Sequence, residues 1–557
     1  MSGNQSMRII VVGASAAGLR AAARARRRLP DARVLVIDQD KFVSYAACGM
    51  PYFVSGDIHS ADKLRETPHG LIRDPAYFRS AKDLEVITET RVERIDRSAR
   101  KVFCRSTKTG EASEYSYDKL VLATGARPIM LHGIPKDGKR FTTFKTLQDA
   151  INLRESLQRG EIGKVAIVGG GFIGCELAEA FGALWGAKVV LIDMASSILP
   201  NMLDPEMASA VEAYLKTEGV EVYTNCPLEG MVESEESVTI KTPYGDFEVD
   251  CAVIAVGVRP NSELAVDCGL AVGKGGGIVV DDRMATNDRN IFAAGDCVEV
   301  KLLVTDNPVQ LPLGSLANRQ GRVVGSNLGG GNERFGPVVG SVAVKIFDMN
   351  VAATGLTEGS ARDAGFNVAC AWGTFADKPE YYPEWQNIHL KLVFDKGSQR
   401  LLGLQGYGKG EVVKRVDGFA ALLKNQGQLE DLLDMEFAYA PPYAPAVDPL
   451  YSLGCAARNA MLEDVEQVSP ETELGDRLVI DVRQSYEVES MPLSEANVRN
   501  IPLEELRKNW EEIPADRPLV AICAKGYRSA ESVRILKEKG FHDVAYVGGG
   551  FLMKPAG

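Results

Sequence analysis

Two segments of this 557-residue chain repeat one order of elements: a β-branched strand, a glycine-rich turn, a helix-prone stretch and a second strand that ends in aspartate. The first unit has its turn at 13–18 and its acid at Asp38, and the second has its turn at 169–174 and its acid at Asp193. This order is typical of nucleotide-binding βαβ units. A tight turn without a ligand would account for one such motif, but it accounts poorly for two, each with its acid. We predict an α/β fold with two dinucleotide-binding, Rossmann-like domains.

The residue types at these turns suit a bound pyrophosphate. Glycine lets the backbone approach the phosphates, and the following helix offers N–H groups and the positive end of its dipole. The acid at the end of the second strand accepts hydrogen bonds from ribose hydroxyls. The predicted cofactor-binding residues are Gly13, Ala17, Gly18 and Asp38 in the first unit, and Gly169, Gly171, Phe172, Gly174 and Asp193 in the second.

Two later motifs point to a flavoprotein. Residues 120–126, LVLATGA, and 286–296, TNDRNIFAAGD, resemble the ATG and GD motifs of two-dinucleotide flavoprotein reductases of glutathione-reductase type. The resemblance implies that an FAD domain is interrupted by an NAD(P) domain. The further FAD contacts that it implies are Thr124, Gly125 and Asp296.

The second glycine turn would then hold the nicotinamide cofactor. Asp193 favours NADH over NADPH, because a carboxylate repels a 2′-phosphate and no arginine follows it in the next four residues. By the same resemblance, Phe172 covers the flavin until NADH displaces it, although simple packing would also explain this residue.

Cys48 decides the predicted chemistry. It lies in the segment 43–52, shortly after Asp38, where reductases of this fold place their redox chemistry. No second cysteine stands at the two-residue or four-residue spacing of a redox disulfide. Neither late histidine, His389 or His542, begins the His-x-x-x-x-Glu motif of glutathione-reductase-like enzymes. We therefore predict a single-cysteine enzyme.

The pattern around this cysteine, Ser-x-x-x-Cys-Gly-x-Pro-Tyr, resembles coenzyme A disulfide reductases, which share single-cysteine chemistry with NADH oxidases and peroxidases. The segments 380–383 and 438–443 resemble the paired tyrosine segments of the coenzyme A disulfide reductases. In that family a tyrosine from each segment reaches the flavin and cysteine of the other subunit. The resemblance implies a homodimer in which Tyr381 and Tyr439 have these roles. The alternative is that both segments are ordinary turns.

The helix after the first glycine turn carries a basic stripe of Arg20, Arg24 and Arg27. At about 100° per residue, these arginines lie within about 60° of one another. A solvated charged face is the usual explanation, but the family's coenzyme A contacts fall at these positions, and guanidinium groups suit phosphates. Ser44 is implied as a further substrate contact. Val447 replaces a lysine of the family, which leaves the affinity for coenzyme A open.

The last hundred residues resemble a rhodanese domain. The apolar strand and Asp-Val-Arg at 478–483 are followed at 519–530 by a strand, a cysteine loop and a helix start. Loop N–H groups, Lys525 and Arg528 would stabilise a thiolate or persulfide at Cys523. We predict that Cys523 and Arg528 are catalytic. An inactive rhodanese-like binding module is the less favoured reading, because such modules usually lack the cysteine.

These motifs divide the chain into four structural units. We expect the FAD domain at 1–118 and 251–335, the NAD domain at 119–250, an α+β dimerisation domain at 336–462 and the rhodanese-like domain at 463–557.

The composition excludes several other classes of protein. The net charge of -12 disfavours nonspecific nucleic-acid binding. No apolar stretch approaches the roughly 18 residues that a membrane span needs. Ten cysteines are too few for a disulfide scaffold, and the N-terminus has no signal-peptide pattern. We expect a soluble cytoplasmic protein without a metal site, a membrane partner or a nucleic-acid partner.

We predict a reductase that uses NADH and FAD to reduce coenzyme A disulfide, coenzyme A persulfide or polysulfide. Cys48 would be its redox cysteine and Cys523 its sulfur carrier, with coenzyme A as substrate or shuttle between them. One alternative is an NADH oxidase or peroxidase that cycles Cys48 through sulfenic acid, which gives the rhodanese-like domain and the basic stripe no task. The other is a sulfurtransferase in which Cys523 is the main actor and the flavin senses redox state.

Overall fold

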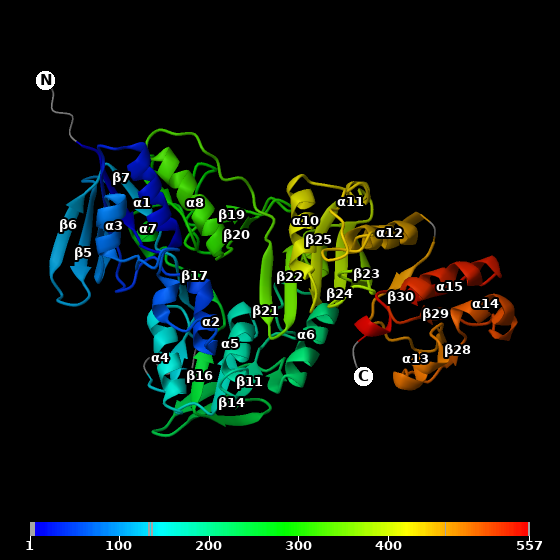
Figure 1. Ribbon diagram of the computed structural model, residues 1–557. Coiled ribbons are helices and arrows are strands. Elements are labelled where there is room, and N and C mark those ends of the chain that lie inside the picture. The colour runs from blue at the N-terminus through cyan, green and yellow to red at the C-terminus, as the bar shows by residue number, and fades with distance from the viewer. Residues whose placement is uncertain (1–5, 132–133, 135–137, 463, 555–557) are drawn as a thin grey trace. The chain divides into compact units, whose positions relative to one another are not determined.

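The chain divides into two compact units. Unit 1 comprises Met1–Met194 and Cys226–Val338, and unit 2 comprises Ala195–Asn225 and Val339–Gly557. The computed structural model describes residues 6–131, 134, 138–462 and 464–554 (Figure 1). Within these ranges, no helix combines the length and the apolar character that a membrane crossing requires.

Unit 1 begins with a parallel sheet in the order β18-β7-β1-β2-β3. Its strands are β1 (Arg8–Val12), β2 (Arg33–Ile37), β3 (Glu85–Ile87), β7 (Lys119–Leu122) and β18 (Ile291–Ala293). The register pairs Val12 with Ile37 and with Leu122. Because the carboxyl ends of parallel strands meet at one edge, the loops after β1, β2, β7 and β18 gather there.

Two helices of unit 1, α1 (Ala16–Arg28) and α8 (Gly314–Asn327), lie side by side (Figure 1). Glycines in α8 permit this approach. A Cβ atom at Gly321 would lie 2.4 Å from the Ala17 carbonyl oxygen, and one at Gly325 would lie 2.5 Å from the Ala21 carbonyl oxygen. Any side chain at these two positions would push the helices apart, so the pair of glycines sets their separation.

The second parallel sheet contains β11-β10-β16-β9 in that order. Its strands are β9 (Phe141–Thr143), β10 (Lys164–Val168), β11 (Lys188–Ile192) and β16 (Cys251–Ile254). The helices α4 (Leu147–Gln158) and α5 (Phe172–Gly182) belong to this region. The chain enters and leaves it through an antiparallel pair, β8 (Ala126–Pro128) and β17 (Val258–Pro260).

This pairing corrects two of the expected domain boundaries. Strand β7 pairs with β1 of the first sheet, although we expected the second domain to begin at residue 119. Strand β16 pairs with β10 of the second sheet, although we expected the second domain to end at residue 250. The physical reason is that the two connecting segments hydrogen-bond to each other a few residues after each expected boundary, at β8 and β17.

The remaining elements of unit 1 are short antiparallel sheets and helices. The sheet β4-β5-β6 comprises Thr90–Asp96, Lys101–Ser106 and Ala112–Ser116, the sheet β13-β14-β15 comprises Gly230–Glu233, Val238–Thr242 and Gly245–Val249, and β19 (Val300–Lys301) pairs with β20 (Pro308–Val309). The helices are α2 (Met50–Ser55), α3 (Pro75–Lys82) and α7 (Glu263–Asp267).

Unit 2 contains an antiparallel sheet in the order β21-β22-β25-β24-β23. Its strands are β21 (Val342–Ile346), β22 (Met349–Gly355), β23 (Val368–Ala376), β24 (Asn387–Asp395) and β25 (Leu401–Gly408). Apolar residues of this sheet form a core with residues such as Phe419 and Leu453 from the helices. The other elements are α6 (Pro205–Thr217), β12 (Val220–Tyr223), α9 (Glu358–Asp363), α10 (Val412–Lys424), α11 (Leu429–Leu433) and α12 (Pro449–Leu462).

A parallel sheet in the order β26-β30-β29-β27-β28 completes unit 2. Its strands are β26 (Gln467–Val468), β27 (Leu478–Asp481), β28 (Val498–Asn500), β29 (Leu519–Ile522) and β30 (Val544–Val547), with the helices α13 (Ser485–Ser490), α14 (Leu503–Asn509) and α15 (Tyr527–Glu538). The Gln467 side chain accepts a hydrogen bond from the Trp372 N–H (3.0 Å) and donates one to the Trp372 carbonyl (3.1 Å). Thr374 on β23 donates a hydrogen bond to the Gly549 carbonyl (2.8 Å). These bonds fasten the last domain to the edge strand β23.

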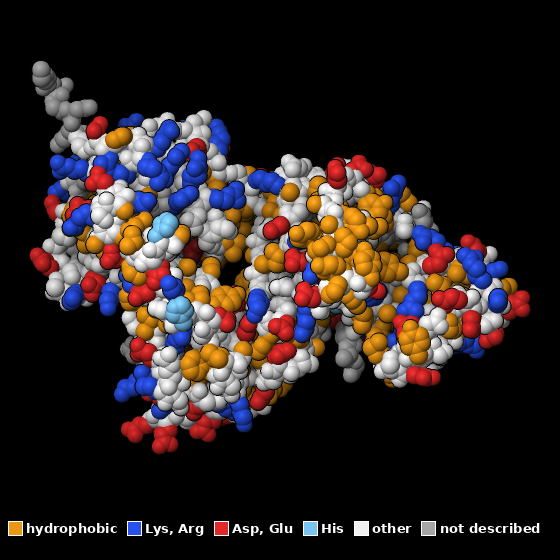
Figure 2. All heavy atoms as spheres, viewed as in Figure 1, with side chains coloured by type: hydrophobic (Ala, Val, Ile, Leu, Met, Phe, Trp, Pro, Cys, Tyr) orange, Lys and Arg blue, Asp and Glu red, His pale blue; other side chains and the backbone are white. Residues whose placement is uncertain are grey.

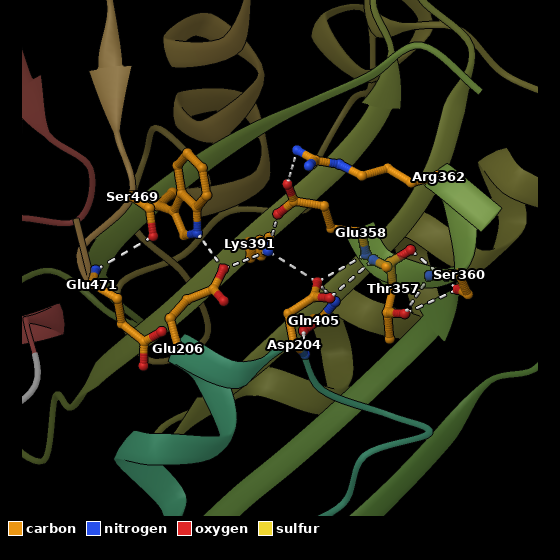
Figure 3. A network of polar contacts seen from close by, with 12 residues as sticks. Asp204, Glu206, Thr357, Glu358, Ser360, Arg362, Lys391, Gln405, Ser469 and Glu471 are labelled. Atoms are coloured by element: carbon orange, nitrogen blue, oxygen red, sulfur yellow. Dashed lines mark hydrogen bonds and ion pairs between the residues drawn. The ribbon is translucent and has the colours of Figure 1, made fainter. Parts of the chain in front are cut away.

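A buried lysine organises the centre of unit 2 (Figure 3). The Lys391 side chain on β24 is fully buried, and its ammonium group contacts Asp204 (2.9 Å), Glu358 (2.7 Å) and Glu206. Burial alone would lower the pKa of Lys391, but the facing groups of Cys370, Glu206, Asp204 and Glu358 raise it above its ordinary value. The ammonium group is therefore the cation that three carboxylates share.

This network joins elements that are distant in sequence. Asp204 directly precedes α6, and its carboxylate accepts the Glu358 N–H (2.9 Å) in the first turn of α9. Gln405 on β25 donates a hydrogen bond to Asp204 (2.6 Å). The Trp372 indole N–H donates a further hydrogen bond to Glu206 (3.0 Å). Glu206 in the first turn of α6 and Asp204 directly before it thus hold this helix to the sheet.

Replacing Lys391 with methionine should destabilise unit 2 by about 3–5 kcal/mol, because two buried carboxylates and one half-buried carboxylate lose their shared cation. Urea unfolding followed by tryptophan fluorescence would measure this loss. Because protonation relieves the repulsion among the carboxylates, the loss should be smaller at pH 5 than at pH 8. Lys409→Met, which removes an exposed lysine from its 3.5 Å pair with Asp348, should cost less than about 1 kcal/mol. Equal stability of the two variants would contradict this interpretation.

Candidate functional site

The first glycine turn connects β1 to α1 and brings backbone very close to backbone. Gly13 has φ +108°, and a Cβ atom there would lie 2.1 Å from the Ala123 carbonyl oxygen. A Cβ atom at Gly18 would lie 1.9 Å from the Gly13 carbonyl oxygen. The predicted acid Asp38 accepts the Ala14 N–H of this turn, and burial raises the pKa of Asp38 to about 6. The turn and its acid thus form one structure at the carboxyl edge of the sheet.

The second glycine turn repeats this geometry. Gly169 has φ +111°, and a Cβ atom at Gly174 would lie 1.9 Å from the Gly169 carbonyl oxygen. Asp193 accepts the Gly170 N–H at 2.6 Å. By contrast, a Cβ atom at Gly171 would meet no atom within 4 Å, so this glycine leaves an open cradle directly before Phe172 at the start of α5. The cradle and the N–H groups of α5 fit a pyrophosphate.

The remaining predicted FAD contacts lie after β7 and β18. Thr124 donates a hydrogen bond to the Asn261 carbonyl (2.6 Å), and the space beside Gly125, which has φ +68°, is open. Asp296 follows β18 and forms an ion pair with Lys145 (3.4 Å). Ala17 lies against the same edge, since a Cβ atom at Gly295 would be 3.1 Å from the Ala17 Cβ atom. These residues fit an extended dinucleotide along the carboxyl edge of the first sheet.

Cys48 lies in the short 3₁₀ helix η1 (Ala47–Gly49), directly before α2. All ten cysteines are free, and Cys48 is the exposed one while the other nine are buried or half-buried. A Cβ atom at Gly314, the first residue of α8, would lie 3.9 Å from the Cys48 Sγ atom. The start of a second helix therefore borders the thiol.

Two residues beside Cys48 were missed by the sequence analysis. Partial desolvation raises the pKa of the Cys48 thiol, the carboxylates of Glu176 and Asp296 raise it further, and Lys145 lowers it. Burial and the neighbouring Glu179 raise the pKa of Glu176 to about 7. The helical spacing from Phe172 to Glu176 was a usable signal, because residues four apart share a helix face. Lys145 gave no such signal.

The three arginines of the basic stripe differ in the structure. Arg20 and Arg27 are exposed on α1. Arg24 is half-buried and donates hydrogen bonds to Ser326 (2.9 Å) and Glu333 (3.1 Å). Figure 2 shows Lys and Arg side chains gathered over the region of α1 and α8. Two of the three arginines are thus available to an anionic ligand, whereas Arg24 is engaged in an ion pair.

Ser44 lies four residues before Cys48 in a strained conformation. Its φ is +54°, in the left-handed region that serine rarely adopts, and its N–H donates to the Ala14 carbonyl (2.9 Å). Holding a non-glycine residue in this region costs of the order of 1 kcal/mol. The contact with the first glycine turn keeps this loop in place.

Unit 2 brings together the two predicted tyrosines. Tyr381 and Tyr439 are 76% and 51% exposed, although 58 residues separate them in the chain. The hydrogen bond between their side chains raises the pKa of Tyr381. Two phenol groups that bond to each other and face solvent form a polar tip that another molecule could meet.

Cys523 lies in the loop between β29 and α15. Its Sγ atom accepts the Gly526 N–H (3.1 Å) and lies 3.4 Å from the Ser529 Oγ atom. Gly526 has φ +103°, which turns its N–H toward the sulfur. The Phe551 N–H bonds to the Cys523 carbonyl (2.8 Å) and holds the loop from behind. The loop thus offers the Cys523 sulfur one backbone N–H donor and one neighbouring hydroxyl group.

The two cations beside Cys523 have partners that the sequence did not predict. Arg528 donates two hydrogen bonds to Glu487 (2.6 and 2.7 Å), and these bonds, with the nearby Cys523 sulfur, raise the pKa of Arg528. Lys525 forms an ion pair with Glu380 instead. Arg528 therefore keeps its expected place, while the charge of Lys525 is turned away toward another segment.

The chain matches three family models in sequence order. Residues 7–321 match the model described as pyridine nucleotide-disulphide oxidoreductase, residues 341–450 match the dimerisation domain of that family, and residues 464–552 match the rhodanese-like domain.

Solved and curated relatives extend over most of the chain. The structure of an NAD-dependent persulfide reductase from A. fulgidus is 39% identical with a TM-score of 0.95, and the match covers 98% of this chain and 100% of that chain. The NAD(P)H coenzyme A polysulfide/persulfide reductase of Pyrococcus horikoshii is 33% identical over 81% of this chain and 99% of its own length. The NADH oxidase of Methanocaldococcus jannaschii is 34% identical over 80% of this chain and 97% of its own length. The chain therefore belongs to the pyridine nucleotide-disulphide oxidoreductase family, with a rhodanese-like domain after the dimerisation domain.

Proposed function

We propose that this protein uses NADH and FAD to reduce coenzyme A disulfide, coenzyme A persulfide or polysulfide. The observation that carries the proposal is the single exposed thiol of Cys48 in a chain whose buried Cys523 accepts a backbone N–H at the start of a helix. The names of the A. fulgidus and P. horikoshii relatives, both persulfide reductases, support it.

In this proposal the first glycine turn, Asp38, Thr124, Gly125 and Asp296 hold FAD. The second turn holds NADH, with Asp193 at the adenosine ribose and Phe172 at the entrance to the flavin. When bound, FAD supplies two-electron transfer from the hydride of NADH to sulfur at Cys48. The Asp193 carboxylate disfavours the 2′-phosphate of NADPH.

Cys48 is the nucleophile. Its thiolate attacks the outer sulfur of coenzyme A persulfide, forming a Cys48 persulfide and releasing the coenzyme A thiolate, which takes a proton. Two electrons and one proton then break the new sulfur–sulfur bond, release hydrogen sulfide and restore the Cys48 thiolate. With coenzyme A disulfide, the same attack releases one coenzyme A thiolate and leaves a mixed disulfide, whose reduction releases the second.

We infer a homodimer in which Tyr381 and Tyr439 reach the partner's flavin and cysteine, where their phenol groups orient substrate or protonate the leaving thiolate. Figure 2 shows hydrophobic side chains gathered over α10, α11 and α12. The exposed apolar residues of this region include Val413, Tyr439, Tyr443, Val447, Tyr451 and Leu462. A patch of this kind on one face supports an interface with a second copy.

Coenzyme A would bind along α1 in this proposal. The exposed guanidinium groups of Arg20 and Arg27 suit its phosphates, and Ser44 contacts the substrate near Cys48. Arg24 is already paired with Glu333, so in this proposal it holds the basic stripe in place rather than binding the phosphates directly. The ten free cysteines support a reducing compartment, and we assign the protein to the cytoplasm.

A second candidate function is supported by the M. jannaschii relative, which is named an NADH oxidase. In that case Cys48 would cycle through sulfenic acid with oxygen or peroxide as the electron acceptor. Comparing anaerobic turnover of coenzyme A persulfide with oxygen consumption by the same purified flavoprotein separates the two candidates.

Cys48→Ser should lower NADH-dependent reduction of coenzyme A disulfide and of coenzyme A persulfide at least about a hundredfold, because serine is not a nucleophile at this pH. Hydrogen sulfide and free thiol release under anaerobic conditions measure the effect. FAD content and sulfur transfer from thiosulfate to cyanide should remain. Cys268→Ser, at a half-buried cysteine of unit 1, is the matched control. Full turnover by Cys48→Ser would refute the proposed role.

Cys523→Ser should abolish sulfur transfer from thiosulfate to cyanide, with a loss of about a hundredfold, since the hydroxyl forms no persulfide. Reduction of coenzyme A disulfide should stay within about twofold of wild type, because that reaction needs only Cys48. Cys455→Ser controls for loss of a thiol from unit 2. Loss of both activities in Cys523→Ser with normal folding would count against separate roles for the two cysteines.

The Glu176 carboxylate is largely ionised above its own pKa of about 7, and its negative charge raises the pKa of Cys48. Glu176→Gln should therefore lower the pKa of Cys48. The pH dependence of Cys48 alkylation by iodoacetamide should shift downward by about half a pH unit. Below pH 6, where Glu176 is protonated in wild type, the two proteins should be alkylated at the same rate. Glu161→Gln, at an exposed carboxylate paired with Arg159, should leave the profile unchanged. An upward shift in Glu176→Gln would reverse the assigned sign.

A further inference from the structure

Lys525 lies in the Cys523 loop between β29 and α15. It contacts residues on both sides of Tyr381, in the first of the two tyrosine segments. Its ammonium group pairs with Glu380, directly before Tyr381, and lies 4.8 Å from the centre of the Trp385 ring, just beyond Glu384. Lys525 is only 19% exposed. One cation thus contacts the residues that flank the exposed turn of residues 381–384.

The base of the same segment is fixed by its own sheet. The Asp377 N–H donates to the Gln386 carbonyl (2.9 Å), and the Gln386 N–H donates to an Asp377 carboxylate oxygen (2.7 Å). These bonds close the loop that joins β23 to β24. The tip beyond them has the Tyr439 hydrogen bond and the Lys525 contacts to hold it.

A second aromatic contact strengthens the junction between the loops. Tyr527, two residues after Lys525, packs edge-to-face on Phe375 at the end of β23, with ring centres 6.0 Å apart. A cavity of about 190 Å³ lies beside them, lined by Lys525, Tyr527, Phe375 and Glu380 among others. The cysteine loop and the tyrosine segment therefore form one packed junction within unit 2.

The sulfur of Cys523 does not engage this lysine. Its donor is the Gly526 N–H, Ser529 lies beside it, and the cation on its side is Arg528. The Lys525 ammonium group instead forms an ion pair with Glu380, an acid 145 residues away in the chain. A lysine that served only the persulfide would have no reason to be turned toward the tyrosine segment.

We propose that Lys525 is a positioning residue for the reductase reaction at Cys48, acting through Tyr381 rather than through Cys523. This role rests on the proposed function, in which Tyr381 enters the active site of the partner subunit. By holding Glu380 and Trp385, the rhodanese-like loop fixes the direction in which Tyr381 projects. The rhodanese-like domain thereby supports the reduction of substrates that do not react with Cys523.

The test uses the full-length holoenzyme in a Cys523→Ser background, so that no sulfur carrier remains, with coenzyme A disulfide as substrate. Lys525→Met should lower kcat/KM about fivefold to tenfold, since a partly buried ion pair and a cation–π contact are lost. The rate of anaerobic flavin reduction by NADH should change less than about twofold. The charge-swapped pair Lys525→Glu with Glu380→Lys should recover most of the activity.

A double-mutant cycle distinguishes positioning from a general effect on the fold. If Lys525 acts through Tyr381, Lys525→Met should add little to the loss caused by Tyr381→Phe. Lys539→Met is the matched control, because Lys539 also lies over an aromatic ring, that of Trp510 (5.4 Å), but away from the tyrosine segment. It should retain full activity.

Three results would overturn the proposal: unchanged kcat/KM in Lys525→Met, losses that simply add in the double mutant, or an equal loss in Lys539→Met. In the Cys523-containing enzyme, a collapse of thiosulfate sulfur transfer in Lys525→Met with intact disulfide reduction would instead assign the lysine to Cys523. Failure of the wild-type enzyme to reduce either coenzyme A substrate with NADH would refute the proposed function itself, and this outcome is read before any variant is compared.

Discussion

The close approach of backbone to backbone at the glycine turns is the constraint on which the rest of unit 1 depends. At Gly18 and Gly174 a single added carbon would lie 1.9 Å from a carbonyl oxygen of the same turn. Helices α1 and α5 can therefore start only where no side chain intervenes. Their position aims N–H groups at one edge of each sheet, and the acids Asp38 and Asp193 bind the same turns. The nucleotide sites are thus consequences of packing as much as of ligand chemistry.

The two cysteines of the proposed function differ in exposure and in their neighbours. Cys48 is exposed and faces carboxylates that raise its pKa, so a cofactor or substrate has to offset that effect before the thiolate forms readily. Cys523 is buried, its sulfur accepts a backbone N–H, and Arg528 lies near it.

The sequence was sufficient for features that depend on local order. The glycine turns, their acids, Cys48 and the Cys523 loop are each encoded within about 30 residues, because strand, turn and helix follow one another directly. The boundaries at 119 and 251 were placed too early, since they depend on the pairing of β8 with β17. The sequence also could not predict the ion-pair partners of Arg24, Lys391 and Lys525. Each is an acid more than 30 residues away, and periodicity carries no information about such pairs.

The amide of Gln467 has a consequence for solubility. Strand β23 is the outer strand of its sheet, and its free N–H and C=O groups would offer a template to any extended chain. Gln467 occupies both backbone groups of Trp372 at once, as a neighbouring strand would, yet a side chain cannot propagate a ladder. The last domain therefore also covers the edge strand β23. A chain cut before residue 464 would expose this strand to pairing with other copies and so to aggregation.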